Sequence, residues 1–251
     1  MERRPPTRRE AKVGTMNIKE ETTKEELESF FGHLDYRLKL HEKTNSAVQP
    51  LLASRFNVFD FIAPDENRLS DILACLLDPE GVHSQGGVFL EGFLHHVCDL
   101  KFSVRNVERV IVRREERTGL IERNRRRLDI LIDVEGFIPE DCFGVGIENK
   151  PWAGEQPEQM SDYLKQLRGK YGNRFRLLYL SASGDEPESI PQSERLALRK
   201  SGHLVCSSYI SLLTWLELCE TSIVSDKVRW FVRDFFAYLH SQFIEEDYDD
   251  E

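Results

Sequence analysis

The sequence predicts an α/β fold, with a central mixed sheet of four to five strands that is flanked by helices and extended by helical additions at both ends. Three segments between residues 107 and 150 alternate polar with branched apolar residues, which is typical of strands. The segments before and after them place apolar residues at helical spacing between capping and stop signals. A run of strands with helices on both sides in sequence indicates one sheet covered by helices.

The chain is expected to start with a disordered leader and an amphipathic helix. Residues 1–21 show no periodicity and contain two adjacent prolines, which argues against a regular element. Residues 22–40 open with two threonines that can cap a helix, and their apolar residues recur at helical spacing. These apolar residues are Leu27, Phe30, Phe31, Leu34 and Leu38.

The remaining elements follow from the same signals. Helices are expected at residues 66–77, 88–100, 155–172, 211–220 and 226–243. Strands are expected at residues 107–116, 126–136, 142–150, 175–183 and 202–209. No linker is wide enough to divide this region, so we expect a single domain over residues 22–243. Residues 244–251 carry six acids and no cation, which predicts a disordered acidic tail.

The composition indicates an ordinary globular protein. The chain has 251 residues, 40% of them hydrophobic, which is enough to build a core. It contains no run of eighteen apolar residues and no apolar stretch behind its basic first residues, so we expect a cytoplasmic protein without a membrane partner. Its five cysteines are odd in number and widely spaced, which predicts reduced thiols.

The distribution of charge is more informative than its total. A formal net charge of -10 argues against a protein that coats nucleic acid over its whole surface. Residues 101–130, however, contain ten cationic and five acidic residues, and an arginine-rich turn lies directly before Asp129. This turn could attract a phosphate backbone, or it could be a solvated basic turn. Its arginines are Arg123, Arg125, Arg126 and Arg127.

The strand that ends at residue 150 carries a possible catalytic pair. Glu148 and Lys150 are two residues apart, so they face the same side of a strand, either as a weak surface ion pair or as part of a site. Asp129 lies on the preceding strand, which can bring its carboxylate beside Glu148, with Asp133 as a competing candidate. Two close carboxylates suit a hard divalent cation, and an adjacent ammonium suits a water nucleophile or an oxyanion. Together these residues describe metal-assisted hydrolysis of a phosphoester.

At these residues the sequence resembles the PD-(D/E)XK nuclease superfamily, the restriction-endonuclease-like enzymes, whose signature is an acid on one strand and E-x-K on the next. Asp129 followed by Glu148, Asn149 and Lys150 matches this signature, whereas Leu128 stands in place of the proline. The chain is more similar still to an uncharacterised bacterial PD-(D/E)XK-like family over about residues 56–181. That family shares segments of the type "ENRLSDILACLLDP", "HSQGGVFLEGFL", "RLDILI" and "IENKPWAGEQPEQMSDYLKQL" in this order.

The resemblance implies a fold, an activity and a set of ligands. It implies a restriction-endonuclease-like αβββαβ core and a nuclease that uses Mg²⁺ or Mn²⁺ to cut phosphodiester bonds in DNA, with anti-phage defence as a context. Asp129, Glu148 and the backbone carbonyl of Asn149 would bind the metal, and Lys150 would orient or activate the attacking water. The alternative is an inactive nuclease-like module that binds nucleic acid or protein. A homodimer and an unidentified protein partner both remain open.

Two helices are expected to complete the site. Glu66 lies on the apolar stripe of its helix, where it either favours the helix dipole or points inward as a further acidic residue and metal ligand. Gln159 and Tyr163 are four residues apart and share a helix face, so they can donate hydrogen bonds near a metal-bound phosphate, or they form a plain exposed face. We expect Trp152 to cap the core or to stack on a base.

Overall fold

The structure is a computed structural model that describes residues 17–53, 56–117, 127–152, 154 and 156–244. The chain divides into two compact units, residues 1–56 and residues 57–251, where the sequence predicted one domain over residues 22–243. Among its described residues the first unit holds one long helix, α1 (Asn17–Leu52), whose first residues fall within the expected leader. Residues 1–16 and the expected acidic tail from residue 245 onward lie outside the described residues.

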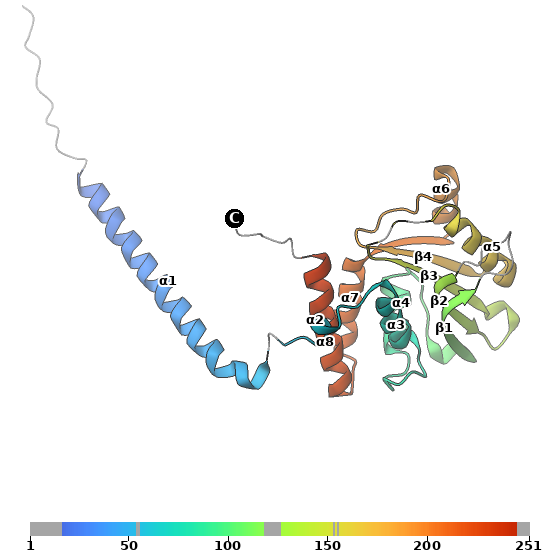
Figure 1. The fold of residues 1–251 in the computed structure, drawn as a ribbon, viewed down its shortest axis with the longest axis horizontal. Helices are drawn as coiled ribbons and strands as arrows, with labels where there is room; N and C mark the ends of the chain where they lie inside the picture. The colour runs from blue at the N-terminus through green and yellow to red at the C-terminus, as the bar shows by residue number, and fades with distance from the viewer. Residues whose placement is uncertain (1–16, 54–55, 118–126, 153, 155, 245–251) are drawn as a thin grey trace, which may run out of the picture. The chain divides into compact units, whose positions relative to one another are not determined.

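The second unit is built on a five-stranded sheet with the strand order β1-β2-β3-β4-β5 (Figure 1). The first three strands pair antiparallel, and β3, β4 and β5 pair parallel, so the sheet is mixed. This confirms the α/β fold class and the αβββαβ order. The strands are β1 (Arg109–Arg117), β2 (Arg127–Glu135), β3 (Phe143–Lys150), β4 (Phe175–Ser181) and β5 (Leu204–Ser208).

Helices cover both faces of this sheet (Figure 1). On one face α3 (Glu66–Leu77) and α7 (Tyr209–Glu220) contact the strands, α4 (Val88–His96) and α8 (Asp226–Phe243) pack on these helices, and α2 (Val58–Ile62) packs on α8. This side holds the larger core. The other face packs against α5 (Gln159–Tyr171) and α6 (Gln192–Lys200) and forms a smaller core. Two short 3-10 helices, η1 (Val104–Asn106) and η2 (Pro139–Asp141), lie in the connections. The three layers place the ends of β2 and β3 between α3 and α5.

Helix α3 shows why the sequence predicts its elements well. The Asp65 side chain accepts a hydrogen bond from the backbone N–H of Arg68 at 2.8 Å, which satisfies one of the free donors at the start of the helix. Leu69, Leu73 and Leu76 are buried, so the apolar stripe faces the core. Capping and burial therefore fix both the start of α3 and its rotation, and with it the direction of its first residue, Glu66.

Two glycines explain how α5 comes close to β3. A Cβ atom on Gly144 would lie 2.2 Å from the Tyr171 ring, and one on Gly146 would lie 2.7 Å from Leu128 and 3.0 Å from Leu167. Because Gly144, Gly146 and Glu148 are two residues apart, they share one strand face. The end of α5 therefore lies over the start of β3, and its beginning lies over Glu148.

Some features differ from the expected ones or add to them. Helix α6 is mostly polar and has one buried residue, Leu198, and neither α6 nor the one-turn α2 was predicted. Helix α1 extends beyond the expected residues 22–40 at both ends and includes Pro50. All five cysteines are free thiols. No helix in the described residues is long and apolar enough to span a membrane.

Candidate active site

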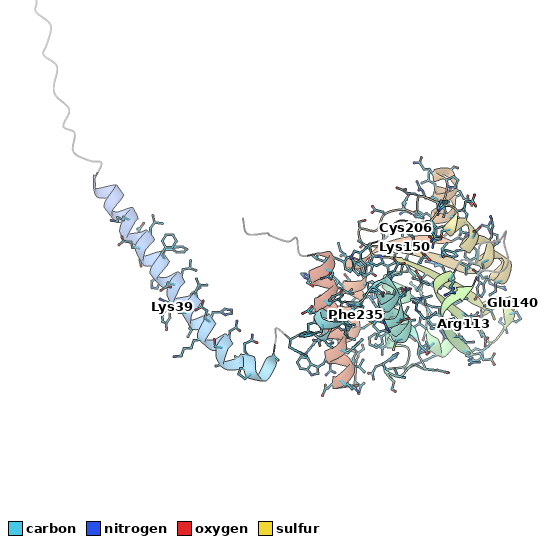
Figure 2. The ribbon with its side chains drawn as sticks, viewed as in Figure 1. Lys39, Arg113, Glu140, Lys150, Cys206 and Phe235 are labelled. Atoms are coloured by element: carbon cyan, nitrogen blue, oxygen red, sulfur yellow. The ribbon has the colours of Figure 1, made fainter. Side chains whose placement is uncertain are left out.

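Glu148 and Lys150 meet at the end of β3, as their spacing predicts. Lys150 is labelled in Figure 2. The Lys150 ammonium Nζ lies 3.0 Å from Glu148 Oε1 and 2.7 Å from Glu66 Oε1. The Glu148 side chain is 1% exposed and the Lys150 side chain 10% exposed, so this is a buried cluster and not a surface ion pair. One lysine from the sheet thus links an acid of its own strand with an acid of α3.

Glu66 points inward from the first turn of α3. Asp65 caps the helix, so the Glu66 carboxylate is available to accept the hydrogen bond from Lys150. Its side chain is 27% exposed, which places it at the rim of the cluster. Of the two roles left open by the sequence, the contact with Lys150 matches the inward one.

Asp129 lies beside the end of β3 and is held from two sides. Its carboxylate accepts a hydrogen bond from the Asn149 backbone N–H at 2.8 Å. The N–H and C=O of one strand residue point toward the same neighbouring strand, so the Asn149 carbonyl also faces the Asp129 side. The Arg114 guanidinium of β1 donates to the Asp129 backbone carbonyl, to the Asn67 carbonyl at 3.2 Å and to Asp71 at 2.8 Å. Arg114 therefore ties β2 to α3 next to the site.

The Asn149 side chain is locked on the opposite face of the sheet. Its Nδ2 donates to Ser70 Oγ at 3.0 Å, and its Oδ1 accepts from the Tyr209 hydroxyl at 2.8 Å. All three residues are buried among apolar side chains, where an unmade hydrogen bond is costly. This lock fixes the backbone between Glu148 and Lys150.

The sequence did not predict Arg114, Ser70 or Tyr209 as parts of the site. Ser70 had a usable signal, because it lies four residues after Glu66 and is a polar residue next to the apolar stripe of α3. Arg114 and Tyr209 carry no such signal in sequence. They reach the site from β1 and from the start of α7.

Gln159 holds Glu148 from the α5 side. Its Nε2 donates to Glu148 Oε1 at 2.6 Å and to the Tyr163 hydroxyl at 3.0 Å, and its Oε1 accepts from the Gln156 backbone N–H at 3.1 Å. Both amide hydrogens are used in these contacts. Gln159 is therefore placed to orient the carboxylate, whereas the sequence suggested a donor to phosphate.

Burial controls the charges of the two acids on the strands. Burial, with a contribution from the nearby Asp129 carboxylate, raises the pKa of Glu148 to about 8, although Lys150 opposes the rise. Burial also raises the pKa of Asp129, although the hydrogen bond from the Asn149 N–H and the charge of Lys150 lower it in part. The charge of Asp129 therefore disfavours the Glu148 anion, and neither carboxylate is fully stabilised as an anion by the protein alone.

Lys150 remains a cation in this environment. Burial lowers its pKa, but the charge of Glu148 and the hydrogen bonds to Glu66 and Glu148 outweigh that effect, so the pKa of Lys150 is raised overall. An ammonium that keeps its proton acts as a hydrogen-bond donor and not as a base.

The oxygen atoms at the strand ends fit a divalent cation. Glu148 Oε2 is buried and has no hydrogen-bond partner among the described residues, although a buried carboxylate oxygen normally has one. The Asp129 carboxylate and the Asn149 carbonyl add hard oxygen donors beside it, which is the ligand type that Mg²⁺ and Mn²⁺ prefer. As the side chains lie, no three His, Cys, Asp or Glu residues within the described ranges converge on one point, since Lys150 is inserted between Glu66 and Glu148.

Asp133, the competing acid of β2, belongs to a different cluster. It lies 2.8 Å from Arg113 and 2.6 Å from Lys170, and its register partner on β3 is Gly144, at the opposite end from Glu148. Figure 2 shows Arg113 in a different part of the unit from Lys150. Burial raises the pKa of Asp133, but the hydrogen bonds from Arg113 and Lys170 lower it to a greater extent. Its charge is thus already balanced.

The expected nucleic-acid contacts fall into three groups. Arg123, Arg125 and Arg126 lie outside the described residues. Arg127 is exposed at the start of β2, two residues from Asp129, and pairs in register with Arg117 of β1. Tyr163 is fully buried, and its hydroxyl donates to the Arg127 backbone carbonyl at 2.7 Å. This burial is at odds with a direct contact between Tyr163 and nucleic acid, and the tyrosine instead holds the backbone at the start of β2.

Trp152 lies beside the site on the surface and does not cap the core. Its ring is 53% exposed and stacks on Phe243 with a centroid separation of 5.6 Å. It lines a cavity of about 360 Å³ that begins at Lys150 and continues along the end of β4, where Ser181 and Ser183 form part of the wall. Because one ring face is covered and the ring is half exposed, base stacking stays possible for Trp152.

The comparison with known families agrees with this geometry. The family model of the PD-(D/E)XK nuclease superfamily matches residues 56–245, which is most of the chain. The chain belongs to the PD-(D/E)XK nuclease superfamily. Searches among curated proteins and among solved structures give no match. In this PD-(D/E)XK chain the matched region contains the whole second unit of the described structure, and with it the acid of β2 and the E-x-K residues of β3.

Proposed function

We propose that the chain is a nuclease that hydrolyses phosphodiester bonds in DNA with the help of Mg²⁺ or Mn²⁺. The observation that carries this proposal is the buried Glu148 carboxylate, which lies beside Asp129 and Lys150 and has one oxygen without a hydrogen-bond partner in the described part of the chain. Such an arrangement is costly for stability unless a cation joins it. Membership of a nuclease superfamily supports the same conclusion.

Three groups are suited to hold the metal. Asp129 and Glu148 would supply carboxylate oxygens, and Asn149 would supply its backbone carbonyl. Glu66 would act at the rim, either as a further ligand or through bound water, because its carboxylate lies 2.7 Å from Lys150 and partly in solvent. When bound, the cation would polarise the phosphodiester and lower the pKa of a water molecule.

Lys150 would assist the reaction as a cationic donor. Its ammonium can donate to the attacking water or to a phosphate oxygen, and it can balance the negative charge that develops in the transition state. Glu66 and Glu148 orient the ammonium through the two contacts described above, and Gln159 orients Glu148 in turn. Glu66 of α3 and Gln159 of α5 thus position the reactive side chains of β3.

The position of the cationic segment supports a polyanionic substrate. At the end of the sheet next to Asp129, β1 ends with Arg117 and β2 begins with Arg127, and the sequence between these residues contains Arg123, Arg125 and Arg126. A chain with a formal net charge of -10 needs such a local cationic surface to hold a phosphate backbone near its own carboxylates.

A substrate panel tests the proposal. The purified chain is incubated with supercoiled plasmid, linear duplex, single-stranded DNA and RNA, each with Mg²⁺, with Mn²⁺ or with EDTA. We expect cleavage of DNA with either metal and none with EDTA. Cleavage that survives chelation would contradict the metal mechanism, and preferential cleavage of RNA would contradict the assignment to DNA.

Binding without cleavage under all these conditions would favour the inactive nuclease-like module. A role in defence against phage, which the resemblance suggests, has a separate test. Cells that express the chain should form fewer phage plaques than cells that express Lys150→Ala, and equal plaque numbers would contradict that role.

A further inference from the structure

Helix α1 carries an exposed apolar stripe that the candidate active site does not use. Phe31 is 59% exposed, Leu38 is 55% exposed, and Leu27 and Leu34 are also exposed on this helix. Large apolar side chains that lie in a row on a helix, in contact with water, usually mark a surface that packs against a partner.

The spacing of the stripe indicates the kind of partner. From Leu27 to Val48 the positions advance in alternating steps of four and three residues: Leu27, Phe31, Leu34, Leu38, His41, Asn45 and Val48. A strict seven-residue repeat keeps one seam facing a second helix only if the two helices coil around each other. This is the a/d pattern of a coiled coil, with Phe31, Leu38 and Asn45 at position a and with Leu27, Leu34, His41 and Val48 at position d.

We propose that α1 pairs with α1 of a second copy of this chain in a parallel, in-register, two-stranded coiled coil. The polar residue at position a is the first argument. Asn45 is exposed on α1, and it would face its own counterpart across the seam of a parallel dimer. A single asparagine at position a disfavours other registers, in which it would lie against apolar side chains, and it also favours a dimer over higher oligomers.

Charge complementarity is the second argument. The e positions hold Glu28, Asp35 and Glu42, which are all acidic, and the g position before Glu42 holds Arg37. In a parallel dimer g faces the following e of the partner, so Arg37 lies opposite Glu42 of the second copy. In an antiparallel dimer e would face e, and the acidic residues would repel each other. The same sequence therefore supports a parallel self-pair and disfavours the antiparallel one.

Sedimentation of the full chain tests the dimer. We expect a dimer for the parent and, for Leu34→Asp or Leu38→Asp, a dissociation constant at least about 100-fold higher, because an acid replaces a buried leucine in both copies. The matched control is Tyr36→Asp, which introduces the same charge at an exposed residue of α1 outside the stripe. A parent that is monomeric at every concentration, or a Leu34→Asp variant that dimerises as tightly as Tyr36→Asp, would overturn the proposal.

Two further variants test register and orientation, and both are read from assembly and not from cleavage. In a parallel, in-register pair, Leu27→Cys faces itself and should form a covalent dimer under mild oxidation, whereas Ser29→Cys, on the outer face, should not exceed the parent, which carries the same five native cysteines. Asn45→Leu should associate more tightly but as a mixture of oligomers. Equal cross-linking of the two cysteine variants, or an Asn45→Leu variant that remains a pure dimer, would overturn the parallel arrangement.

Discussion

At the scale of single residues, Glu148 is the central residue of the site. The protein buries its carboxylate and balances the negative charge only in part. Its Oε1 has two donors, Lys150 and Gln159, while its Oε2 has none among the described residues. Burial therefore raises the pKa of Glu148 to about 8, from an ordinary value of 4.5. A divalent cation would remove this imbalance, since it binds the anion and lowers its pKa. Burial therefore disfavours the Glu148 anion without a cation and favours the binding of a cation beside it.

The raised pKa predicts that metal binding depends on pH. Below pH 8 the metal-free carboxyl holds a proton, and a cation must displace it in order to bind. The affinity for Mg²⁺ should therefore increase by up to about tenfold per pH unit as the pH approaches 8 and level off above it. Calorimetry at pH 7 in two buffers of different ionisation enthalpy should show the release of about one proton per cation. An affinity that is constant between pH 6 and 8 would contradict the prediction.

Variants of Asp129 and Lys150 should distinguish metal binding from the cleavage step. Asp129→Asn removes an anionic ligand, so Mg²⁺ affinity should fall by at least about tenfold. Lys150→Ala removes a cation that lies between two acids, so Mg²⁺ should bind at least as well as in the parent while cleavage is lost. Calorimetry with Mg²⁺ on both variants checks this. An equal loss of affinity in both would show that the two residues do not have separate roles.

The residues that the sequence could reveal are those with a local pattern. Glu148 and Lys150 share a strand face because they are two residues apart, and Glu66 belongs to the apolar stripe of α3, so both inward orientations could be predicted. Arg114 and Tyr209 could not, because their partners Asp129 and Asn149 become neighbours only when β1 and α7 pack. Tyr163 looked like a contact residue since a tyrosine on a polar helix can face either way, and the depth of the α5 interface buries it.

At the scale of elements, the end of β3 is held rigid by helices on both faces of the sheet. Asn149 connects it to α3 through Ser70 and to α7 through Tyr209, while Gln159 connects it to α5 through Glu148. Catalytic groups that are placed on a strand and supported by such contacts keep their geometry better than groups on loops.

This lock predicts a measurable loss of stability. Tyr209→Phe removes the hydroxyl and leaves the buried Asn149 Oδ1 without a donor, so the free energy of unfolding should fall by about 1 to 3 kcal/mol. Urea denaturation of the second unit checks this, with the exposed Tyr36→Phe as the matched control. A Tyr209→Phe variant as stable as Tyr36→Phe would show that the hydrogen bond contributes nothing to stability.

The elements that matter most for the site could be predicted from sequence, and the reasons are physical. Strands β2 and β3 and helix α3 bury their residues in regular patterns, and α3 has a capping acid and a stop signal. Helix α6 was missed because it buries one leucine, and the length of α1 was underestimated because its apolar residues at helical spacing were followed only as far as Leu38. Hydrophobic sequence patterns are weakest in elements that bury few side chains.

At the scale of the whole molecule, an acidic chain has to present a cationic surface to a polyanion. The formal net charge is -10, and the arginine segment before Asp129 is the strongest local excess of positive charge that the sequence offers. We therefore assign the approach of the phosphate backbone to this segment as a hypothesis that salt dependence can test.

Changing Arg125 and Arg126 to Ala together should weaken DNA binding uniformly across sequences. Each lost phosphate contact lowers the slope of log K against log salt by about 0.9 for duplex DNA, so the slope should shrink by roughly 2. Binding is measured with Mg²⁺ in a Lys150→Ala background, which blocks cleavage. Changing the exposed Lys200 of α6 and Lys227 of α8 to Ala removes the same charge and should leave the slope unchanged. An unchanged slope for the arginine pair would mean that neither arginine touches phosphate.

The measurement that tests the central claim most directly is cleavage of supercoiled plasmid by the parent chain, by Lys150→Ala and by Glu140→Gln, each with Mg²⁺ and with EDTA. Glu140 is an exposed acid of η2, so its variant controls for handling and for the loss of one charge outside the site. We expect the parent and Glu140→Gln to cut the plasmid only with Mg²⁺ and Lys150→Ala to leave it intact. Cleavage by Lys150→Ala at the parent's rate, or cleavage in EDTA, would contradict the assignment of the reaction to Asp129, Glu148 and Lys150.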